Sequence, residues 1–125
     1  MIEIKTNPKN GNGFDTLHTF ENWKVAFITY AEQYGKLKTL KRHLLTDETF
    51  TLIEGNAKLY TADNNSPLGV IHLEKNKVYV VKKNTWHHLQ ISKNALLLVV
   101  ENSNTSKENT ESKMLTLNEL KEINE

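Results

Sequence analysis

The sequence has 125 residues, of which 38% are apolar and 25% are charged, and its formal net charge is +1. A chain of this length can build one hydrophobic core, so we expect a single domain over residues 1–125. The balance of 16 basic against 15 acidic residues argues against a nucleic-acid or anionic-membrane partner, because such binding depends on a basic surface. The absence of cysteine excludes disulfides, thiolate metal sites and cysteine nucleophiles.

The apolar runs of the sequence are short. The longest, residues 95–100, is far below the roughly 20 residues that cross a bilayer as a helix. The first residues, 1–5, lack a basic segment followed by a signal-type apolar stretch. We therefore expect a soluble cytoplasmic protein.

Residues 7–13 are rich in turn-forming residues and predict a loop. After this loop, β-branched and aromatic runs separated by Gly, Asn, Asp or Pro predict eight short strands, at residues 23–30, 37–43, 49–54, 57–61, 70–73, 78–81, 87–91 and 96–101. Gly55 and Asn56 both tolerate positive φ and predict a two-residue hairpin turn, and residues 63–67 predict a loop. Short strands at this spacing, without helical periodicity between them, indicate a sandwich or barrel.

The C-terminal part of the sequence differs in pattern. Residues 101–113 are polar and predict a surface loop, and Thr116 with Glu119 then fits a helix capping box. One helical face carries the apolar side chains Leu117, Leu120 and Ile123. We expect a short helix packed against the barrel.

At the other end of the sequence, a strand near residues 2–4 is expected to cover a sheet edge or to pair across a two-fold axis, so we expect a homodimer.

Strand alternation places a group of polar side chains toward the interior, because alternate residues of a strand share a face. Lys41 and His43 point the same way, and Glu48 and His87 each share a face with two core-type residues of their own strands. His88 is expected to point away from the core. Burying this cluster without partners is costly, so mutual hydrogen bonds, water, a ligand or a metal must satisfy it.

The spacing of these residues resembles the two sequence motifs of the cupin superfamily. The first motif is Gly, five residues, His-x-His, three or four residues, Glu, six residues and Gly, and its positions are occupied here by Gly35, Lys41, His43, Glu48 and Gly55. Lysine replaces the first histidine. The second motif is Gly, five residues, Pro-x-Gly, two residues, His, three residues and Asn, and its positions are occupied by Asn76, Lys82, Asn84, His87 and Ile91. Asn84 is a mild replacement for glycine, because Asn visits the left-handed region more readily than most residues.

The resemblance covers residues 23–101 and implies an all-β fold, the cupin-type double-stranded β-helix or jelly-roll barrel, followed by a polar loop and short helix in residues 102–125. It also implies that His43, Glu48 and His87 are metal ligands. Two imidazoles and one carboxylate suit a divalent ion such as Fe, Mn, Ni or Zn. Lys41 conflicts with a nearby dication. Either it turns aside or stays neutral while three residues hold the metal, or no metal binds and Lys41 pairs with Glu48.

Two functions remain open at this point. The first is a metal-dependent enzyme of isomerase, lyase or dioxygenase type, acting on a small polar metabolite such as a sugar or carboxylic acid, with Lys41 or Glu48 as the catalytic residue that moves a proton. The alternative is a non-catalytic module that binds a small anion without metal, through Lys41 and the histidines. We expect the side chain of Tyr30 at the wall of the ligand pocket.

Overall fold

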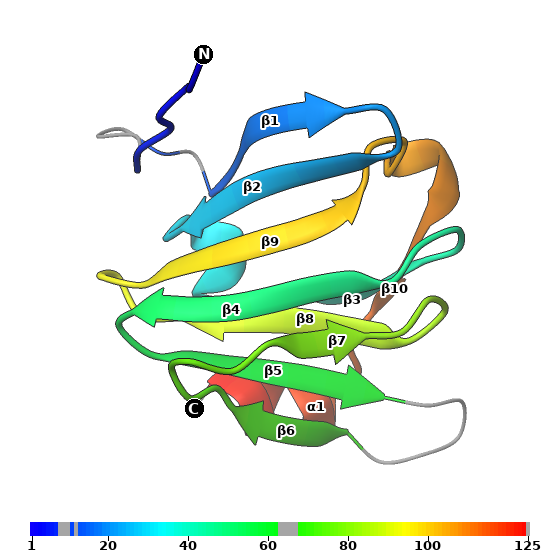
Figure 1. Ribbon diagram of the computed structural model, residues 1–125. Helices are drawn as coiled ribbons and strands as arrows, with labels where there is room; N and C mark the ends of the chain where they lie inside the picture. The colour runs from blue at the N-terminus through cyan, green and yellow to red at the C-terminus, as the bar shows by residue number, and fades with distance from the viewer. Residues whose placement is uncertain (8–10, 12, 63–67, 125) are drawn as a thin grey trace.

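Two antiparallel sheets face each other across the hydrophobic core in the computed structural model (Figure 1). The structure describes residues 1–7, 11, 13–62 and 68–124, so the expected loop at 63–67 and part of the one at 7–13 lie outside the described residues. The first sheet has the order β1 (Phe14–Phe20), β2 (Trp23–Thr29), β9 (Leu96–Asn102), β4 (Glu48–Glu54) and β7 (Tyr79–Val81). The second has the order β10 (Thr110–Met114), β3 (Thr39–His43), β8 (Trp86–Ile91), β5 (Ala57–Ala62) and β6 (Gly69–His72).

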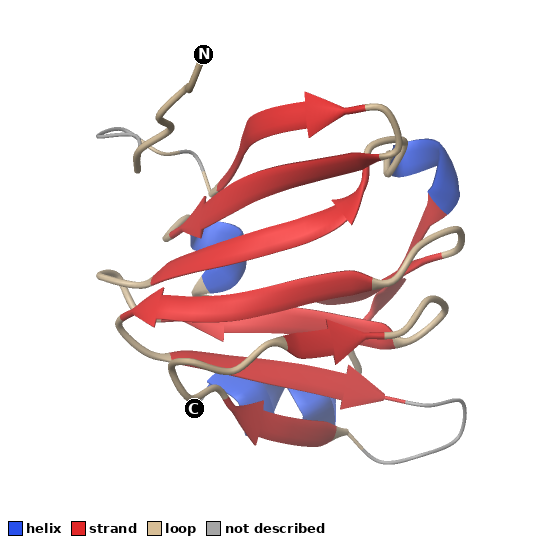
Figure 2. Ribbon diagram, in the orientation of Figure 1, coloured by secondary structure: helices blue, strands red, loops and turns tan. Residues whose placement is uncertain are grey.

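Helical structure is minor in the described residues (Figure 2). Two single turns of 3-10 helix, η1 (Glu32–Tyr34) and η2 (Lys107–Asn109), lie in connections between strands, and one α-helix, α1 (Leu117–Asn124), ends the chain. None of these helices is long and apolar enough to cross a membrane. The predicted all-β class with a short C-terminal helix is confirmed.

The eight predicted strands are all present as β2 to β9, each within two residues of its expected bounds. Their pairing is long-range. β4 pairs with β9 and β5 pairs with β8. Strands β2 to β5 and β6 to β10 alternate between the sheets, whereas β1 pairs with β2 and β5 with β6 as neighbours in the chain. This alternation is the topology of a jelly roll.

The turn at Gly55 and Asn56 was wrongly predicted as a hairpin, because β4 and β5 belong to different sheets. The turn carries the chain from one sheet to the other. Gly55 has φ +76°, and a Cβ atom there would lie 2.7 Å from Cα of Ala95. The position therefore needs glycine, both for its backbone conformation and for the close approach of the next turn.

The two terminal regions also differ from expectation. Residues 2–4 form no strand, and the edge of the first sheet is formed by β1, which the sequence pattern did not reveal. The polar segment 101–113, expected to be a surface loop, contains η2 and most of β10. Strand β10 was missed because it is an exposed edge strand, so its side chains lack the alternation of a half-buried strand.

The core between the sheets is built by the inward positions of the strands. Leu97 and Val99 of β9 are fully buried, and Phe50 and Leu52 of β4 are 3% exposed. The same inward face carries Glu48 and Glu101, at the point where β4 and β9 pair residue to residue. Polar side chains thus occupy the end of an otherwise apolar interior.

A second apolar cluster lies between the sheet of β5 and helix α1, which sits behind β5 and β6 in Figure 1. Ile123 of α1 is 3% exposed and Leu120 is partly buried, whereas Leu117, expected on the same face, is 80% exposed. The predicted capping box is confirmed, because the side chains of Thr116 and Glu119 each accept a hydrogen bond from the other's backbone N–H, at 3.2 and 2.9 Å.

Candidate metal centre and its cavity

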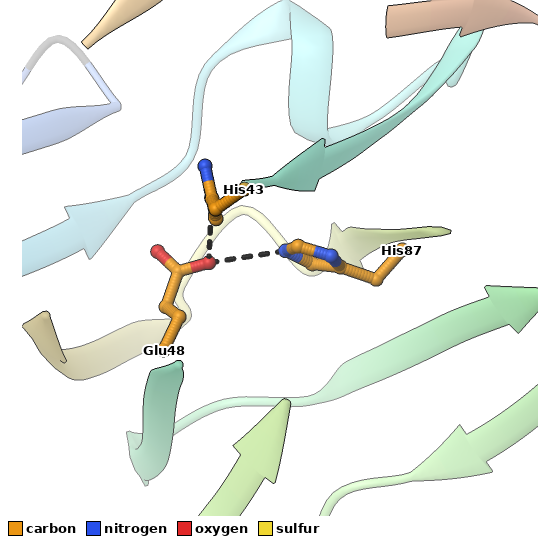
Figure 3. A group of neighbouring side chains, drawn as sticks. All are labelled: His43, Glu48 and His87. Carbon is orange, nitrogen blue, oxygen red and sulfur yellow. Dashed lines mark hydrogen bonds and ion pairs between the residues drawn. The ribbon is translucent and has the colours of Figure 1, made fainter. Parts of the chain in front are cut away.

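Three strands bring His43, Glu48 and His87 together inside the barrel (Figure 3). His43 ends β3 and His87 lies in β8, both in the second sheet, while Glu48 begins β4 in the first sheet. The four-residue connection between β3 and β4 carries the chain across, so His43 and Glu48 face each other from opposite sheets. The polar group therefore bridges the two sheets at one end of the core.

Both histidines contact the same carboxylate oxygen. The distance from Oε1 of Glu48 is 3.1 Å to Nε2 of His43 and 3.0 Å to Nε2 of His87 (Figure 3). The candidate ligand atoms of the three residues lie within 4.8 Å of one another. The side chains of Glu48 and His87 are 6% exposed and that of His43 is 14% exposed.

The second nitrogen of each ring is held by a neighbour. His87 Nδ1 lies 2.9 Å from the carbonyl oxygen of Thr85, and a carbonyl only accepts, so Nδ1 carries the proton in that hydrogen bond. Its Nε2 then faces the Glu48 carboxylate as a lone pair, unless a second proton or a cation lies between them. His43 is less constrained, because its Nδ1 partner at 2.9 Å is the hydroxyl of Thr110, which donates or accepts.

This arrangement fits a divalent metal ion. A carbonyl that fixes the Nδ1–H tautomer leaves Nε2 free to coordinate, which is the usual way in which proteins orient metal-binding histidines. Two imidazole nitrogens and one carboxylate oxygen suit Fe, Mn, Ni or Zn and leave coordination positions for water or substrate. The three residues present are thus able to hold such an ion.

The charge of Glu48 is stabilised by its histidine neighbours. Burial raises the pKa of Glu48, but hydrogen bonds with His43 and His87 outweigh burial and hold the pKa at about 2, below its ordinary value of 4.5. The carboxylate is therefore available as an anionic ligand across the physiological pH range.

Lys41 lines the cavity but is exposed, and it pairs across the strands with His87 of β8. Lys41 and Glu48, both in the described part of the chain, form no ion pair with each other. Glu48 contacts the two histidines instead. The arrangement in which Lys41 neutralises Glu48 is therefore not the one formed. An exposed ammonium group remains solvated, which lowers its conflict with a dication.

Glu101 is a buried carboxyl group that the motif comparison did not reveal. It lies directly opposite Glu48 in the pairing of β4 with β9, is 7% exposed and lines the same cavity. Strand alternation could have found it, because it shares a strand face with the apolar residues Leu97 and Val99. Its Oε1 lies 3.7 Å from Nζ of Lys24.

The environment of Glu101 favours its neutral form. Burial and the adjacent charge of Glu48 raise the pKa of Glu101 to about 7, while Lys24 opposes the shift. Among the described residues, its Oε2 atom is buried without a hydrogen-bond partner. A proton on Glu101 allows a hydrogen bond with Glu48, so two like charges need not face each other across the strands.

The cavity around these residues has a volume of about 590 Å³. Tyr34 of η1 lines it, whereas Tyr30, the aromatic residue expected at the wall, is not among its lining residues. His88, expected to point away from the core, also lines the cavity and is 8% exposed. The reason is that Tyr34 covers it, with ring centroids 5.6 Å apart. Burial lowers the pKa of His88 to about 4.

No protein-family model matches the sequence, and no curated protein matches it. The structure is nevertheless similar to solved structures. It aligns with Pac13 from Streptomyces, a nucleoside dehydratase of which a variant was solved with uridine, with a TM-score of 0.65 and 13% identity over 92% of this chain and 93% of that chain. A mutant of oxalate decarboxylase from Bacillus subtilis gives a TM-score of 0.60 and 13% identity over 85% of this chain and 30% of that chain.

A cupin-2 domain protein from Shewanella frigidimarina gives a TM-score of 0.56 and 19% identity over 74% of this chain and 83% of that chain. At these identities, the similarities show the fold. The protein has the cupin-type double-stranded β-helix, and the resemblance inferred from the two motifs is confirmed at this level. Asn84, with φ +66°, and Asn76, with φ +67°, adopt left-handed conformations at motif positions that are glycine in cupins.

Proposed function

We propose that this protein is a cytoplasmic metal-dependent enzyme that acts on a small polar metabolite such as a sugar or a carboxylic acid. The observation that carries the proposal is the convergence of His43, Glu48 and His87 on one point of a cavity of about 590 Å³. Cavities of roughly 300–1,000 Å³ are the usual size for small-molecule sites. A bound divalent ion would polarise a carbonyl or hydroxyl oxygen of the substrate.

The charges that line the cavity support an acidic substrate. Lys24, Lys41 and Lys107 all line it, together with four hydroxyl-bearing residues, Thr105, Ser106, Thr110 and Ser112. Ammonium and hydroxyl groups bind carboxylate or phosphate oxygens by charge-assisted hydrogen bonds. A substrate with an acidic group toward the lysines and a carbonyl or hydroxyl group toward the histidines matches both ends of the site.

Lys41 is the residue that we assign to proton transfer when a metal is bound, because Glu48 is then a ligand. In a metal-free site Glu48 takes this role. The similar structures with a named reaction, a nucleoside dehydratase and an oxalate decarboxylase, both eliminate a small molecule from their substrate. This favours lyase chemistry over isomerase or dioxygenase chemistry.

A second candidate function is metal-free binding of a small anion. The replacement of the first motif histidine by Lys41 favours it, because this removes one ligand and adds a positive charge. The contact between His87 and Glu48 is also satisfied by a proton on His87 Nε2 in place of a metal ion.

Metal titration separates the two functions. The protein is purified without added metal, its metal content is measured by elemental analysis, and Mn²⁺, Fe²⁺, Ni²⁺ and Zn²⁺ are titrated calorimetrically into wild type and His43→Ala. Glu54→Gln, an exposed position of β4, is the control. The enzyme proposal predicts stoichiometric binding that His43→Ala abolishes and Glu54→Gln retains. Absence of binding in wild type at millimolar metal would reject it in favour of anion binding.

A further inference from the structure

The carboxyl group of Glu101 has no role in the three-residue metal site, yet its surroundings are unusual for a structural residue. It is 7% exposed, it lines the cavity, and it lies opposite Glu48 in the register of β4 and β9. Its Oε2 atom is buried without a hydrogen-bond partner among the described residues. Buried polar atoms are nearly always paired, and an unpaired one calls for an explanation.

The contacts of Glu101 with basic groups do not explain its burial. The Lys24 ammonium lies 3.7 Å from Oε1, beyond hydrogen-bond distance, and it donates instead to the carbonyl oxygen of Thr105 at 3.3 Å. Two neighbouring carboxyl groups inside a barrel repel each other when both are ionised, so the pair needs either a shared proton, as in the metal-free site, or a positive charge beside it. A divalent ion held by His43, Glu48 and His87 would supply that charge.

Direct coordination by Glu101 does not fit the geometry. Glu101 is not part of the group whose ligand atoms lie within 4.8 Å of one another. The coordination positions that three protein ligands leave open are filled by water or substrate, and a water on a divalent ion is a strong hydrogen-bond donor. Glu101 lines the cavity beside the site, and its buried, unpaired Oε2 atom is an acceptor of the kind that such a donor requires.

We propose that Glu101 is a positioning residue of the metal site, and that its Oε2 atom accepts a hydrogen bond from a water or substrate hydroxyl on the bound ion. This inference rests on the metal site of the proposed function. Lys41 occupies the position of the first motif histidine, so the site has one ligand fewer than the motif implies. Glu101 then compensates by adding a second negative charge near the ion. With two carboxylates, two neutral imidazoles and one dication, the net charge of the site is zero.

Metal affinity of matched variants tests this proposal. Mn²⁺ and Zn²⁺ are titrated into wild type, Glu101→Gln, Glu48→Gln and the exposed control Glu54→Gln, and folding of each is checked by thermal unfolding. Loss of a partner that binds through water typically lowers metal affinity by about 10–100-fold. We expect this decrease for Glu101→Gln, no measurable binding for Glu48→Gln, and wild-type affinity for Glu54→Gln.

Each other outcome overturns a distinct part of the proposal. Equal affinity of wild type and Glu101→Gln would remove Glu101 from the site and leave the three-residue metal centre intact. Loss of binding as complete as in Glu48→Gln would show direct coordination. A decrease that disappears in high salt would show a long-range charge effect without a hydrogen bond. No binding by wild type would reject the metal centre of the proposed function and this role of Glu101 together.

Discussion

Replacing Glu101 by glutamine is expected to stabilise the metal-free protein at high pH, although it removes a functional group. The pKa of Glu101 is about 7 in the folded protein and 4.5 as its ordinary value. The unfolded chain therefore releases this proton between pH 4.5 and 7 while the folded protein retains it. Stability falls as the pH rises through this window and stays lower above it.

The magnitude follows from the pKa difference. One pH unit corresponds to about 1.4 kcal/mol, so the difference between 4.5 and about 7 lowers the stability of wild type by up to about 3 kcal/mol above pH 7. The glutamine side chain of the variant does not titrate, and its amide group can donate to Glu48 as protonated Glu101 does. Glu101→Gln should therefore match wild type at about pH 4 and exceed it by up to about 3 kcal/mol at about pH 8.

Urea unfolding at both pH values, in the presence of a chelator, measures this difference through the fluorescence of Trp86, which is 8% exposed. The dependence of unfolding free energy on urea should be the same in both proteins, because the buried surface is unchanged. The control Glu54→Gln is exposed and should behave as wild type at both pH values. Glu101→Gln that is less stable than wild type at about pH 8, or that differs from it equally at both values, would refute the argument.

Three further predictions concern the same strands and the assembly. The depressed pKa of Glu48 means that its ionised carboxylate stabilises the fold above pH 4.5, and wild type should lose this stabilisation as the pH falls from 4.5 to about 2. An acid titration followed by circular dichroism should show this loss for wild type and not for Glu48→Gln. Lys41→His should raise zinc affinity by about tenfold or more, since it removes a positive charge and restores a ligand; unchanged affinity would contradict this. We expect a homodimer, and exposed Val80 and Val100 on the outer face of one sheet offer an apolar surface for the contact. Light scattering should give a molar mass of roughly twice 14.4 kDa, and a monomer at all concentrations would contradict this expectation.

The barrel strands were predictable because their inward positions alternate with outward ones. On β4, residues Glu48, Phe50 and Leu52 are buried while the residues between them are more exposed. The same rule, applied to β9, places Glu101 inward and would have revealed it. The motif comparison directed attention to His43, Glu48 and His87, and Glu101 lies after the second motif.

Features that depend on packing between distant segments were not predictable. His88 has a sequence position that faces outward, but η1, more than 50 residues earlier, covers it with Tyr34. Strand β10 is polar, and its position in the sheet is determined by backbone pairing with β3. The periodicity of side chains in a sequence gives no signal of such backbone pairing. The link at Gly55 has the composition of a hairpin turn, and only the pairing partners of β4 and β5 show that it joins two sheets.

The most direct measurement of the metal centre is an anomalous difference map from crystals soaked in Mn²⁺ or Zn²⁺, recorded at the absorption edge of the ion. The account predicts one peak inside the cavity, within about 2.0–2.2 Å of Nε2 of His43, Oε1 of Glu48 and Nε2 of His87. Glu101 should lie beyond direct coordination, joined to the ion through water. An interior without a peak, or a peak held by other residues, would contradict the assignment of these three side chains as a metal site.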